Sequence, residues 1–499
     1  MSTPLNRLTK LVGEVADLRH AADLLEWDER VCMPEGGAQV HGEMLATIRR
    51  LAHEKLTADA VGEALDQLNG HRGGLDPDSS LSRMIAVTAR DYDKATKVPA
   101  DFVAEQARIV SAAQPAWARA RSACSFSIFQ PHLEAIIGLK RRYVTFFPSA
   151  DHPYDVLLDD YEPGMKTADV KAILGTLRPR QVELIRALAE RPPIAAAFLH
   201  VPYAEQELWA FAVDVITAFG FDWAHGRQDK SVHPFATAFG ADDVRMTTRF
   251  VEGQPFGLLF GAMHEAGHGL YEQGVSGAHH RTQLEGGASL GVHESQSRLW
   301  ENLVGRSLPF WEHFFPKLQA RFPSQLGGVT LPQFYKGINK VERSLIRVEA
   351  DEATYNLHVM LRVELEIALV EGGIAVEDLP EAWNSRMQEY LGITPPNDAS
   401  GVLQDIHWSA GLLGYFATYT LGNLIAAQLW DKFQAIDPAR DDQIRRGDFS
   451  ALRSWLGSEI HQYGRMYQPR ELVKRVTGSS IDPEPYLRYL ESKYRGIYS

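Results

Sequence analysis

Two histidines four residues apart, with a glutamate beside the first, are the residues that most directly indicate chemistry in this sequence. His264, Glu265 and His268 form an HExxH motif, written HEAGH at residues 264–268. On an α-helix, residues four apart lie on one face, about 6 Å apart along the axis, so the two imidazoles can bind one metal ion. The glutamate can then take a proton from a water molecule on that ion, as in metal-assisted peptide hydrolysis.

The residues around the motif predict the helix that this geometry requires. In the stretch 256–274, apolar side chains recur near helical spacing. They are Phe256, Leu259, Phe260, Met263 and Leu270. HExxH also occurs by chance, and the alternative is a helix with two ordinary histidines and a solvated glutamate. The helical context favours the metal site.

A catalytic zinc site needs a third protein ligand and one open position for water. Residues 289–304 predict a second amphipathic helix, and the Gly- and Ser-rich segment before it permits an antiparallel return. Glu294 on this helix is therefore the predicted third ligand. Because adjacent residues on a helix face different directions, His293 and Glu294 are not both expected to face the metal. The competing candidates are His279, His280, His293, Glu285 and Glu301.

The composition indicates a globular protein and argues against a nucleic-acid binder. The chain is 45% hydrophobic and 23% charged, and its net charge of −13, with a pI near 5.8, provides no positive excess for phosphate groups. The sequence has two cysteines, Cys32 and Cys124, which predicts neither a disulfide framework nor a thiolate zinc cluster. The N-terminus lacks the apolar core of a signal peptide, and no apolar run has the length of a membrane span. We therefore expect a cytoplasmic protein.

Helical periodicity covers most of the chain and predicts a mainly α fold. We expect helices near residues 6–25, 38–55, 58–68, 80–95, 101–122, 129–145, 167–191 and 331–372. Length alone suggests more than one domain. We find no linker, repeat or low-complexity tract, so we expect residues 1–499 to form a single catalytic domain.

An exception to helix lies directly before the HExxH motif. Residues 242–251 are rich in Val, Thr and Phe and predict a strand, and therefore a small β-sheet beside the HExxH helix. A strand edge in this place can hold an extended peptide through main-chain hydrogen bonds. His233, in the adjoining segment 231–240, is a candidate substrate-binding residue, and a satisfied core or loop histidine is the alternative.

A charged group after the metal helices is a candidate for recognising a peptide C-terminus. Arg347 lies among acidic residues in the stretch 345–355, LIRVEADEATY. Such a cluster is usually a solvated helix face. The other interpretation is that Arg347, braced by Asp351 at i+4, faces a ligand carboxylate, which a guanidinium binds in a bidentate manner.

A polar and aromatic stretch at residues 401–423 offers donors for a transition-state oxyanion. His407 and Tyr415 are our candidates, followed by Tyr419. A donor aimed at such an oxyanion contributes a few kcal/mol, of order 3, to catalysis. The alternative is that all three are core residues whose polar atoms are satisfied within the protein.

The motifs taken together resemble the M32 metallocarboxypeptidases, a family of thermostable bacterial and archaeal carboxypeptidases that also occurs in trypanosomatids. The resemblance extends over nearly the full chain and is far more specific than HExxH alone. The motifs are HPF (233–235), DVRMT (243–247), HEAGH (264–268), HESQ (293–296), IRVEADEATY (346–355) and GVLQDIHW (401–408).

The resemblance implies a large helical, cleft-shaped body with a small sheet, N-terminal helices that form a lid over the cleft, and a homodimer. It implies removal of C-terminal residues one at a time, with broad preference and poor cleavage next to proline. Zinc ligation is carried over to His264, His268 and Glu294, and base and acid chemistry to Glu265. Arg347 becomes the expected anchor for the substrate carboxylate, and His407 is expected in the substrate cleft. By analogy with angiotensin-converting-enzyme-type peptidases, His233 and Tyr415 are expected to hold substrate carbonyls.

The sequence therefore predicts a zinc-dependent carboxypeptidase acting on peptides, with no nucleic-acid or membrane partner. Cobalt or manganese can also occupy a site with two histidines and a glutamate. An endo- or oligopeptidase of the same HExxH class is the nearer alternative. A helical scaffold that keeps a metal only for stability is the more distant one, but a structural zinc takes four protein ligands and needs no adjacent base.

Overall fold

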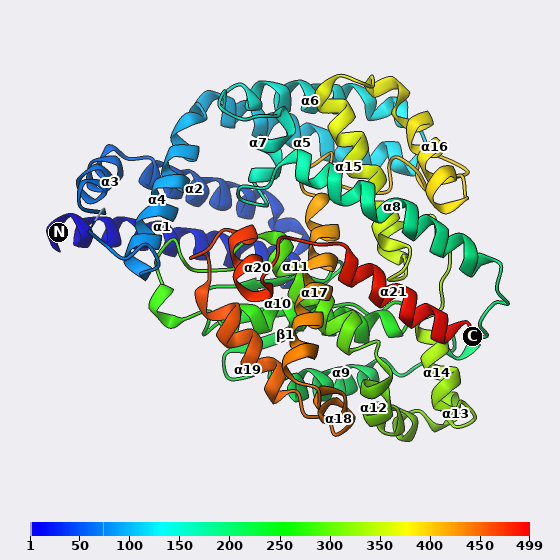
Figure 1. The fold of residues 1–499 in the computed structure, drawn as a ribbon. Coiled ribbons are helices and arrows are strands. Elements are labelled where there is room, and N and C mark those ends of the chain that lie inside the picture. The colour runs from blue at the N-terminus through cyan, green and yellow to red at the C-terminus, as the bar shows by residue number, and fades with distance from the viewer. Residues whose placement is uncertain (1, 73) are drawn as a thin grey trace.

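Helices make up most of the computed structural model, which describes residues 2–72 and 74–499. The first helices lie at one end of the molecule, on the left in Figure 1, and carry the N-terminus. They are α1 (Ser2–Val31), α2 (Ala38–Leu56), α3 (Asp59–Arg72) and α4 (Ser80–Lys97). The next helices form the upper part of the view. They are α5 (Ala100–Ser122), α6 (Gln130–Val144), α7 (Pro153–Asp159) and α8 (Thr167–Ala189).

The middle of the chain supplies the centre and the lower part of the view in Figure 1. Its helices are α9 (Glu205–Phe219), α10 (Phe256–Gln273), α11 (Leu290–Arg298), α12 (Leu308–Arg321), α13 (Pro323–Leu326) and α14 (Leu331–Ile338), and a π-helix spans Leu299–Val304. The C-terminal part adds α15 (Tyr355–Glu371), α16 (Leu379–Leu391), α17 (Ala417–Ile436), α18 (Arg440–Arg445), α19 (Ser450–Glu459), α20 (Pro469–Thr477) and α21 (Glu484–Ile497). The predicted mainly α fold is confirmed.

A three-stranded sheet lies beside α10, as predicted. Its strands are β1 (Gly226–Lys230), β2 (Ala236–Ala238) and β3 (Val244–Thr248), in the order β1-β3-β2. The buried strand β3 lies inside the predicted stretch 242–251 and pairs with β1 in parallel and with β2 antiparallel. Strand β1 is not predicted from the sequence, because its polar residues GRQDK show no apolar alternation. β2 is an edge strand, so one of its sides is not paired within the sheet.

Helices α10, α11 and α17 pack closely because two glycines allow their backbones to approach. A Cβ at Gly267, within the HExxH motif, would lie 2.5 Å from the Gln296 carbonyl oxygen on α11. A Cβ at Gly422 on α17 would lie 2.5 Å from Cγ of Glu294. Distances this short do not occur in real contacts, so only glycine fits at either position without movement of its neighbours.

Helices α10 and α11 run antiparallel, as the sequence analysis expected. His264 near the middle of α10 contacts Glu301 beyond the end of α11, whereas Glu272 at the end of α10 contacts His293 near the start of α11. This pairing brings both HExxH histidines against one face of the second helix.

The predicted continuous helix over residues 331–372 is wrong in its middle. Helix α14 ends at Ile338, α15 begins at Tyr355, and the loop between them contains only a short 3₁₀ turn at Arg347–Glu349. The carboxylate of Asp351 explains the loop, because it accepts hydrogen bonds from the backbone N–H groups of Glu342, Ala353 and Thr354. These local bonds satisfy the backbone without a helix.

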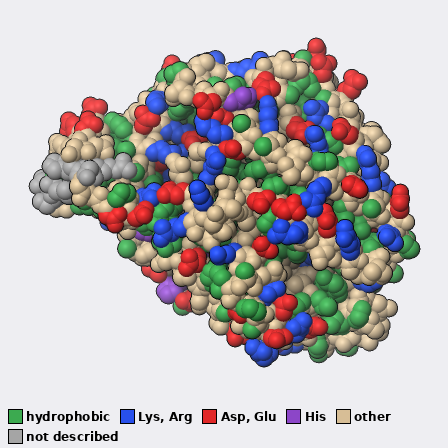
Figure 2. All heavy atoms as spheres, viewed as in Figure 1, with side chains coloured by type: hydrophobic (Ala, Val, Ile, Leu, Met, Phe, Trp, Pro, Cys, Tyr) green, Lys and Arg blue, Asp and Glu red, His purple; other side chains and the backbone are tan. Residues whose placement is uncertain are grey.

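The N-terminal helix α1 is attached to the sheet by aromatic and cationic contacts. Trp27 lies near two guanidinium groups, with Arg227 Cζ 5.2 Å and Arg245 Cζ 4.5 Å from its ring centroid. On the face shown in Figure 2, acidic and basic side chains are interspersed. Within residues 2–72 and 74–499, we find no helix that combines the length and apolar character needed to cross a membrane.

Candidate active site

Three side chains from two neighbouring helices converge at the centre of the molecule. His264 and His268 lie on α10, and Glu294 lies on α11. The Nε2 atoms of the two histidines are 3.5 and 3.6 Å from Glu294 Oε2, and the three ligand atoms lie within 4.8 Å of one another. These separations are long for hydrogen bonds but suit three donors around one ion. We call these residues the metal-ligand cluster.

The position of Glu294 depends on how α11 begins. Ser289 is the N-cap residue, and its hydroxyl accepts a hydrogen bond from the Val292 N–H at 3.0 Å. The Gly291 N–H donates to the fully buried carboxyl group of Glu162, which comes from the loop after α7. Burial raises the pKa of Glu162 to about 8.

His264 is held from behind by a carboxylate. Its Nδ1 atom lies 2.9 Å from Glu301 Oε2, and Glu301 belongs to the π-helix that follows α11. Burial opposes ionisation of Glu301, but the hydrogen bond from His264 and the charge of Arg298 lower its pKa to about 2. Glu301 is therefore an anion that accepts the Nδ1 proton, which leaves Nε2 of His264 free for a metal.

His268 is held by a second histidine and not by a carboxylate. Its Nδ1 atom lies 2.8 Å from Nδ1 of His293, whose Nε2 atom lies 2.6 Å from Glu272 Oε1. Burial lowers the pKa of His268 to about 4. If Nε2 of His268 is kept free for a metal, Nδ1 must donate to His293, and His293 must donate to Glu272. The hydrogen bonds thus assign one consistent tautomer to each ring.

Glu265 lies beside the metal-ligand cluster and is 6% exposed. Burial raises its pKa to about 7, against the lowering effect of His264. Glu294 differs: burial would raise its pKa, but Arg298 and His264 hold it well below the ordinary value. One carboxyl group is thus a permanent anion, and the other is in a range where it can gain and lose a proton.

The residues present fit a divalent metal ion. Two imidazole nitrogens and one carboxylate oxygen are the donor types of three-ligand catalytic zinc sites. The Nε2 atoms face Glu294 because each Nδ1 atom is already engaged in a hydrogen bond.

The other candidate ligands of the sequence analysis lie outside this set of donor atoms. Glu301 and His293 contact the back of His264 and His268. Glu285 and His280 form a separate pair, with His280 Nδ1 3.1 Å from Glu285 Oε1. His279 is buried nearby, at 3% exposure, and burial lowers its pKa.

Arg347 belongs to a second buried group, which we call the arginine cluster: Arg347, Arg362 and Asp405. Arg347 Nε and Nη2 donate to Asp405 Oδ1 at 3.0 and 2.8 Å, and Arg362 Nε donates to Asp405 Oδ2 at 2.7 Å. The predicted brace from Asp351 is wrong, because the Asp351 oxygens bind backbone N–H groups and the acid that holds Arg347 is Asp405. Burial opposes the ionisation of Asp405, but the two arginines hold its pKa far below the usual range.

His407, Tyr415 and Tyr419 lie together beside Arg347. His407 Nε2 is 3.1 Å from the Tyr419 hydroxyl, and the Tyr415 ring centroid is 5.3 Å from the His407 ring and 5.4 Å from the Tyr419 ring. Arg347 Cζ lies 4.9 Å from the Tyr419 ring centroid. Burial lowers the pKa of His407 to about 3 and raises that of Tyr415 to about 12. The negative charge of Glu294 also raises the pKa of Tyr415, so Tyr415 lies within electrostatic reach of the metal-ligand cluster.

His233 is placed differently from the other candidates. It lies in an exposed loop before β2, where its carbonyl accepts a hydrogen bond from the Ser231 hydroxyl at 2.7 Å. Among the described residues, no hydrogen bond or ring contact joins the His233 side chain to the metal-ligand cluster.

Asp405, Arg362 and Glu272 are not among the site residues predicted from the sequence. Arg362 carried a signal, because it is a single arginine inside the largely apolar helix α15 and it is completely buried. A buried arginine requires a carboxylate or carbonyl partner. Asp405 lies in the same polar stretch as His407, but nothing local indicates that it faces Arg347.

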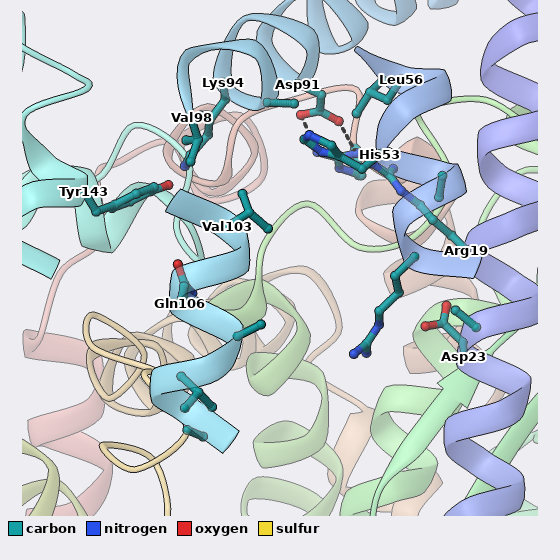
Figure 3. A pocket seen from close by; sticks show the side chains of 18 residues that line it. Arg19, Asp23, His53, Leu56, Asp91, Lys94, Val98, Val103, Gln106 and Tyr143 are labelled. Atoms are coloured by element: carbon teal, nitrogen blue, oxygen red, sulfur yellow. Dashed lines mark hydrogen bonds and ion pairs between the residues drawn. The ribbon is translucent and has the colours of Figure 1, made fainter. Parts of the chain in front are cut away.

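Two cavities border the N-terminal helices, and the smaller of them also reaches the metal-bearing part of the molecule. The larger, of about 830 Å³, is lined by α1, α2, α4 and α5 and is shown in Figure 3. A smaller one, of about 330 Å³, reaches Thr237 on β2 and Glu272 at the end of α10. Both are lined by Arg19, Asp23 and Arg465. The smaller cavity therefore lies between the edge strand, the end of the metal-bearing helix and helix α1.

Comparisons with known proteins agree with this arrangement. Residues 7–494 match the family described as carboxypeptidase Taq (M32) metallopeptidase. The chain is 41% identical to Thermostable carboxypeptidase 1 of Thermus thermophilus, over 98% of each chain. It is 35% identical to Carboxypeptidase 1 of Bacillus subtilis, over 98% of this chain and 97% of that one. The crystal structure of M32 carboxypeptidase from Deinococcus radiodurans R1 is similar with a TM-score of 0.97 and 40% identity, covering 99% of both chains.

Proposed function

Because the chain belongs to the M32 family of metallopeptidases and is a metal-dependent carboxypeptidase, we propose that its metal is zinc, held by His264, His268 and Glu294. Cobalt and manganese are the expected substitutes. We further propose that it releases single residues from peptide C-termini with broad preference and cleaves poorly next to proline. The observation that carries the proposal is the convergence of three donor atoms within 4.8 Å on a helix that also presents Glu265.

A bound zinc ion supplies Lewis acidity at the scissile carbonyl and lowers the pKa of a water molecule towards neutrality. Glu265 is then the base that takes the proton of this water and the acid that returns it to the leaving amine. Its buried position supports this role, because burial raises its pKa to about 7. A general base is most effective when its pKa is near the working pH.

Arg347 is the proposed anchor for the C-terminal carboxylate of the substrate. A guanidinium has five N–H groups, and three of those in Arg347 bond Asp405 and Tyr355. In the described part of the chain, this leaves two N–H groups for a ligand. Two arginines share one aspartate, so the arginine cluster has an excess positive charge that a carboxylate would neutralise.

The neighbouring aromatic residues are proposed to bind the rest of the reacting group. Tyr415 keeps its proton because its pKa is raised to about 12, so it can donate a hydrogen bond to an oxyanion. His407 is neutral at working pH, with a pKa lowered to about 3, and is the second candidate donor. Tyr419 is proposed to orient His407 and contact substrate, and His233 to contact the peptide from the loop before β2.

The path of the peptide is proposed to follow the unpaired side of β2. An extended chain there forms main-chain hydrogen bonds that do not depend on side-chain identity, which suits a broad preference. The smaller cavity, lined by Thr237 and Arg19, gives room for the upstream part of a peptide.

The setting of the enzyme is proposed from the family resemblance and the composition. Residues 1–499 are proposed to form one catalytic domain in which the N-terminal helices are a lid over the cleft. We propose a cytoplasmic homodimer that acts on peptides, without nucleic-acid or membrane partners. The net charge of −13 supports the exclusion of nucleic acid.

The test is a mass-spectrometric time course on one peptide, supplied as the free acid and as the C-terminal amide. We expect a ladder of single-residue losses from the free acid only. A chelator should abolish the ladder, and added zinc should restore it. Internal fragments from both peptides would indicate the oligopeptidase alternative, and no cleavage with metal bound would indicate a scaffold. A peptide with an internal proline should stop the ladder there.

A further inference from the structure

We propose that Tyr355 is a positioning residue that fixes the distance between the metal-ligand cluster and Arg347. Its ring contacts an arginine that is held by the metal ligand Glu294, and its hydroxyl contacts Arg347. The inference rests on the proposed function, in which Arg347 anchors the carboxylate of the substrate. It adds a physical reason for the release of one residue at a time.

The first contact joins Tyr355 to the metal side. Arg298 Nε donates to Glu294 Oε1 at 2.7 Å, and Arg298 Nη1 lies 3.3 Å from Glu301 Oε2. The Cζ atom of Arg298 lies 4.4 Å from the Tyr355 ring centroid, within the range of a cation–π contact. Arg298 therefore has two carboxylates on one side, the metal ligand Glu294 and the Glu301 that holds His264. On its other side it has the face of the Tyr355 ring.

The second contact joins Tyr355 to the anchor. Arg347 Nη1 donates to the Tyr355 hydroxyl at 2.8 Å. The opposite edge of the Arg347 guanidinium bonds Asp405. Two partners on different edges fix the plane of a guanidinium, so Tyr355 helps to determine where the free N–H groups of Arg347 point.

The surroundings of Tyr355 make it a rigid spacer. It is the first residue of α15, its backbone N–H bonds the Asp351 carbonyl at 3.0 Å, and it is only 6% exposed. Its ring meets the Tyr419 ring edge to face, with centroids 6.1 Å apart. A tyrosine side chain has two main torsions and a ring of fixed length, so its two ends cannot move independently.

A fixed separation has a direct consequence for the reaction. A carboxylate bound to Arg347 and a scissile carbonyl at the metal must be one residue apart for single-residue release. Tyr355 contacts Arg298 on the metal side and Arg347 on the anchor side. It therefore keeps this separation while substrates with different side chains bind. Tyr355 therefore contributes to register and not to side-chain preference.

The closing experiment is a double-mutant cycle with wild type, Tyr355→Phe, Arg347→Ala and the double variant. Each is assayed for kcat and KM on the free-acid peptide and on its amide, and for zinc affinity. Phenylalanine keeps the ring that faces Arg298 and removes the hydroxyl that faces Arg347. We expect Tyr355→Phe to raise KM for the free acid roughly tenfold, with kcat changed less and zinc affinity unchanged. In the Arg347→Ala background, the same change should have no further effect on KM.

A second variant tests the metal side of the spacer. Tyr355→Leu removes the ring, so we expect about tenfold weaker zinc binding and the appearance of two-residue products. Tyr486→Phe is the matched control. It also removes a buried tyrosine hydroxyl, which donates at 3.0 Å to the carbonyl of Glu352 in the loop just before Tyr355. This control should leave KM and zinc affinity unchanged.

The outcomes separate the inference from the proposed function. Equal effects of Tyr355→Phe with and without Arg347 would overturn the spacer role, as would equal effects of Tyr355→Phe and Tyr486→Phe. Tyr355→Leu with wild-type zinc affinity and only single-residue products would overturn it too. If Arg347→Ala leaves the preference for free acid over amide unchanged, the proposed anchor is wrong, whatever Tyr355→Phe does.

Discussion

The metal-ligand cluster and the arginine cluster are both largely buried, but their charges are unbalanced in opposite directions. Around the metal ligands, three carboxyl groups (Glu265, Glu294 and Glu301) face two guanidinium groups (Arg298 and Arg306), so the excess is negative whenever Glu265 is ionised. In the arginine cluster, two guanidinium groups share the single carboxylate of Asp405.

This difference indicates what each region binds. A buried charge without a partner costs several kcal/mol, on the order of 3 or more, so an uncompensated excess is costly unless a ligand completes it. The negative excess suits a metal cation, and the positive excess suits the carboxylate of a peptide. Changes that affect one cluster should therefore leave the ligand of the other cluster bound.

The largest expected effect is on catalysis alone. Glu265→Gln removes the base and keeps the shape and both histidine ligands, so we expect turnover to fall roughly 10²- to 10⁴-fold. Zinc affinity should stay within a few fold, because Glu265 is not one of the three donor residues. The measurements are kcat on a free-acid peptide and zinc content after dialysis. Near-wild-type turnover in this variant would contradict the assignment of the base.

The next change affects only the arginine cluster. Asp405→Asn leaves two buried guanidinium groups without their carboxylate, so we expect the free energy of unfolding to fall by roughly 3–5 kcal/mol. KM for free-acid peptides should rise, whereas zinc affinity should not change. Urea denaturation and zinc titration provide these measurements.

A surface ion pair gives the control for this change. Asp431 Oδ2 lies 3.3 Å from Arg488 Nη2, and the Asp431 side chain is 56% exposed. Asp431→Asn should therefore cost less than about 1 kcal/mol. Weakened zinc binding in Asp405→Asn would contradict the independence of the two clusters.

A third change affects only the metal-ligand cluster. In Gly422→Ala, the new methyl group would lie 2.5 Å from Cγ of Glu294 and must displace this ligand. Overpacking of this kind costs about 1–3 kcal/mol, so we expect zinc binding to weaken roughly tenfold or more. The preference for free acid over amide should remain, because Arg347 is untouched.

The control for this change is an alanine in an open position on α10. A Cβ at Gly257 would meet nothing within 4 Å. Gly257→Ala should leave zinc affinity unchanged and stabilise the helix by about 0.5–1 kcal/mol. Equal zinc affinity in both variants would show that Glu294 can move without loss of binding.

The two clusters also differ in how far the sequence predicts them. His264 and His268 lie on one helix at a fixed spacing, so their type and periodicity determine their geometry. Glu294 follows on the next helix, and a short connection restricts where that helix can lie. Local rules therefore predicted this grouping of side chains, together with the helix and the strand β3.

The arginine cluster depends on contacts that no local rule contains. Arg347 and Asp405 are 58 residues apart in sequence. Asp351 was the nearer acid, but it bonds backbone N–H groups and ends the predicted helix. The sequence therefore predicts Arg347 but not its partner, because the pairing is determined by how α15 packs against the loop that carries His407.

The last prediction concerns the two carboxyl groups of raised pKa that support the clusters. Glu162 accepts the Gly291 N–H at the start of α11, and burial raises its pKa to about 8. Glu366 bonds Tyr154, Trp408 and Gly414 around the loop that carries His407, and burial raises its pKa to about 7. Both supports are therefore protonated in the folded protein at pH values where an unfolded glutamate is ionised.

The sign of the pH effect follows from these raised values. Between about pH 4.5 and 8 the folded protein retains the Glu162 proton, whereas the unfolded chain releases it, so stability falls as pH rises through this window. Glu162→Gln is neutral at every pH, and its amide oxygen can accept the Gly291 N–H. We expect it to match wild type near pH 5 and to exceed it by roughly 2–4 kcal/mol near pH 8.5. Glu366→Gln should gain less, because its window ends near pH 7 and an amide has only one oxygen for three donors. Urea titrations at both pH values measure the difference, and a Glu162→Gln gain that is equal at pH 5 and pH 8.5 would mean that this support is already ionised in the folded protein.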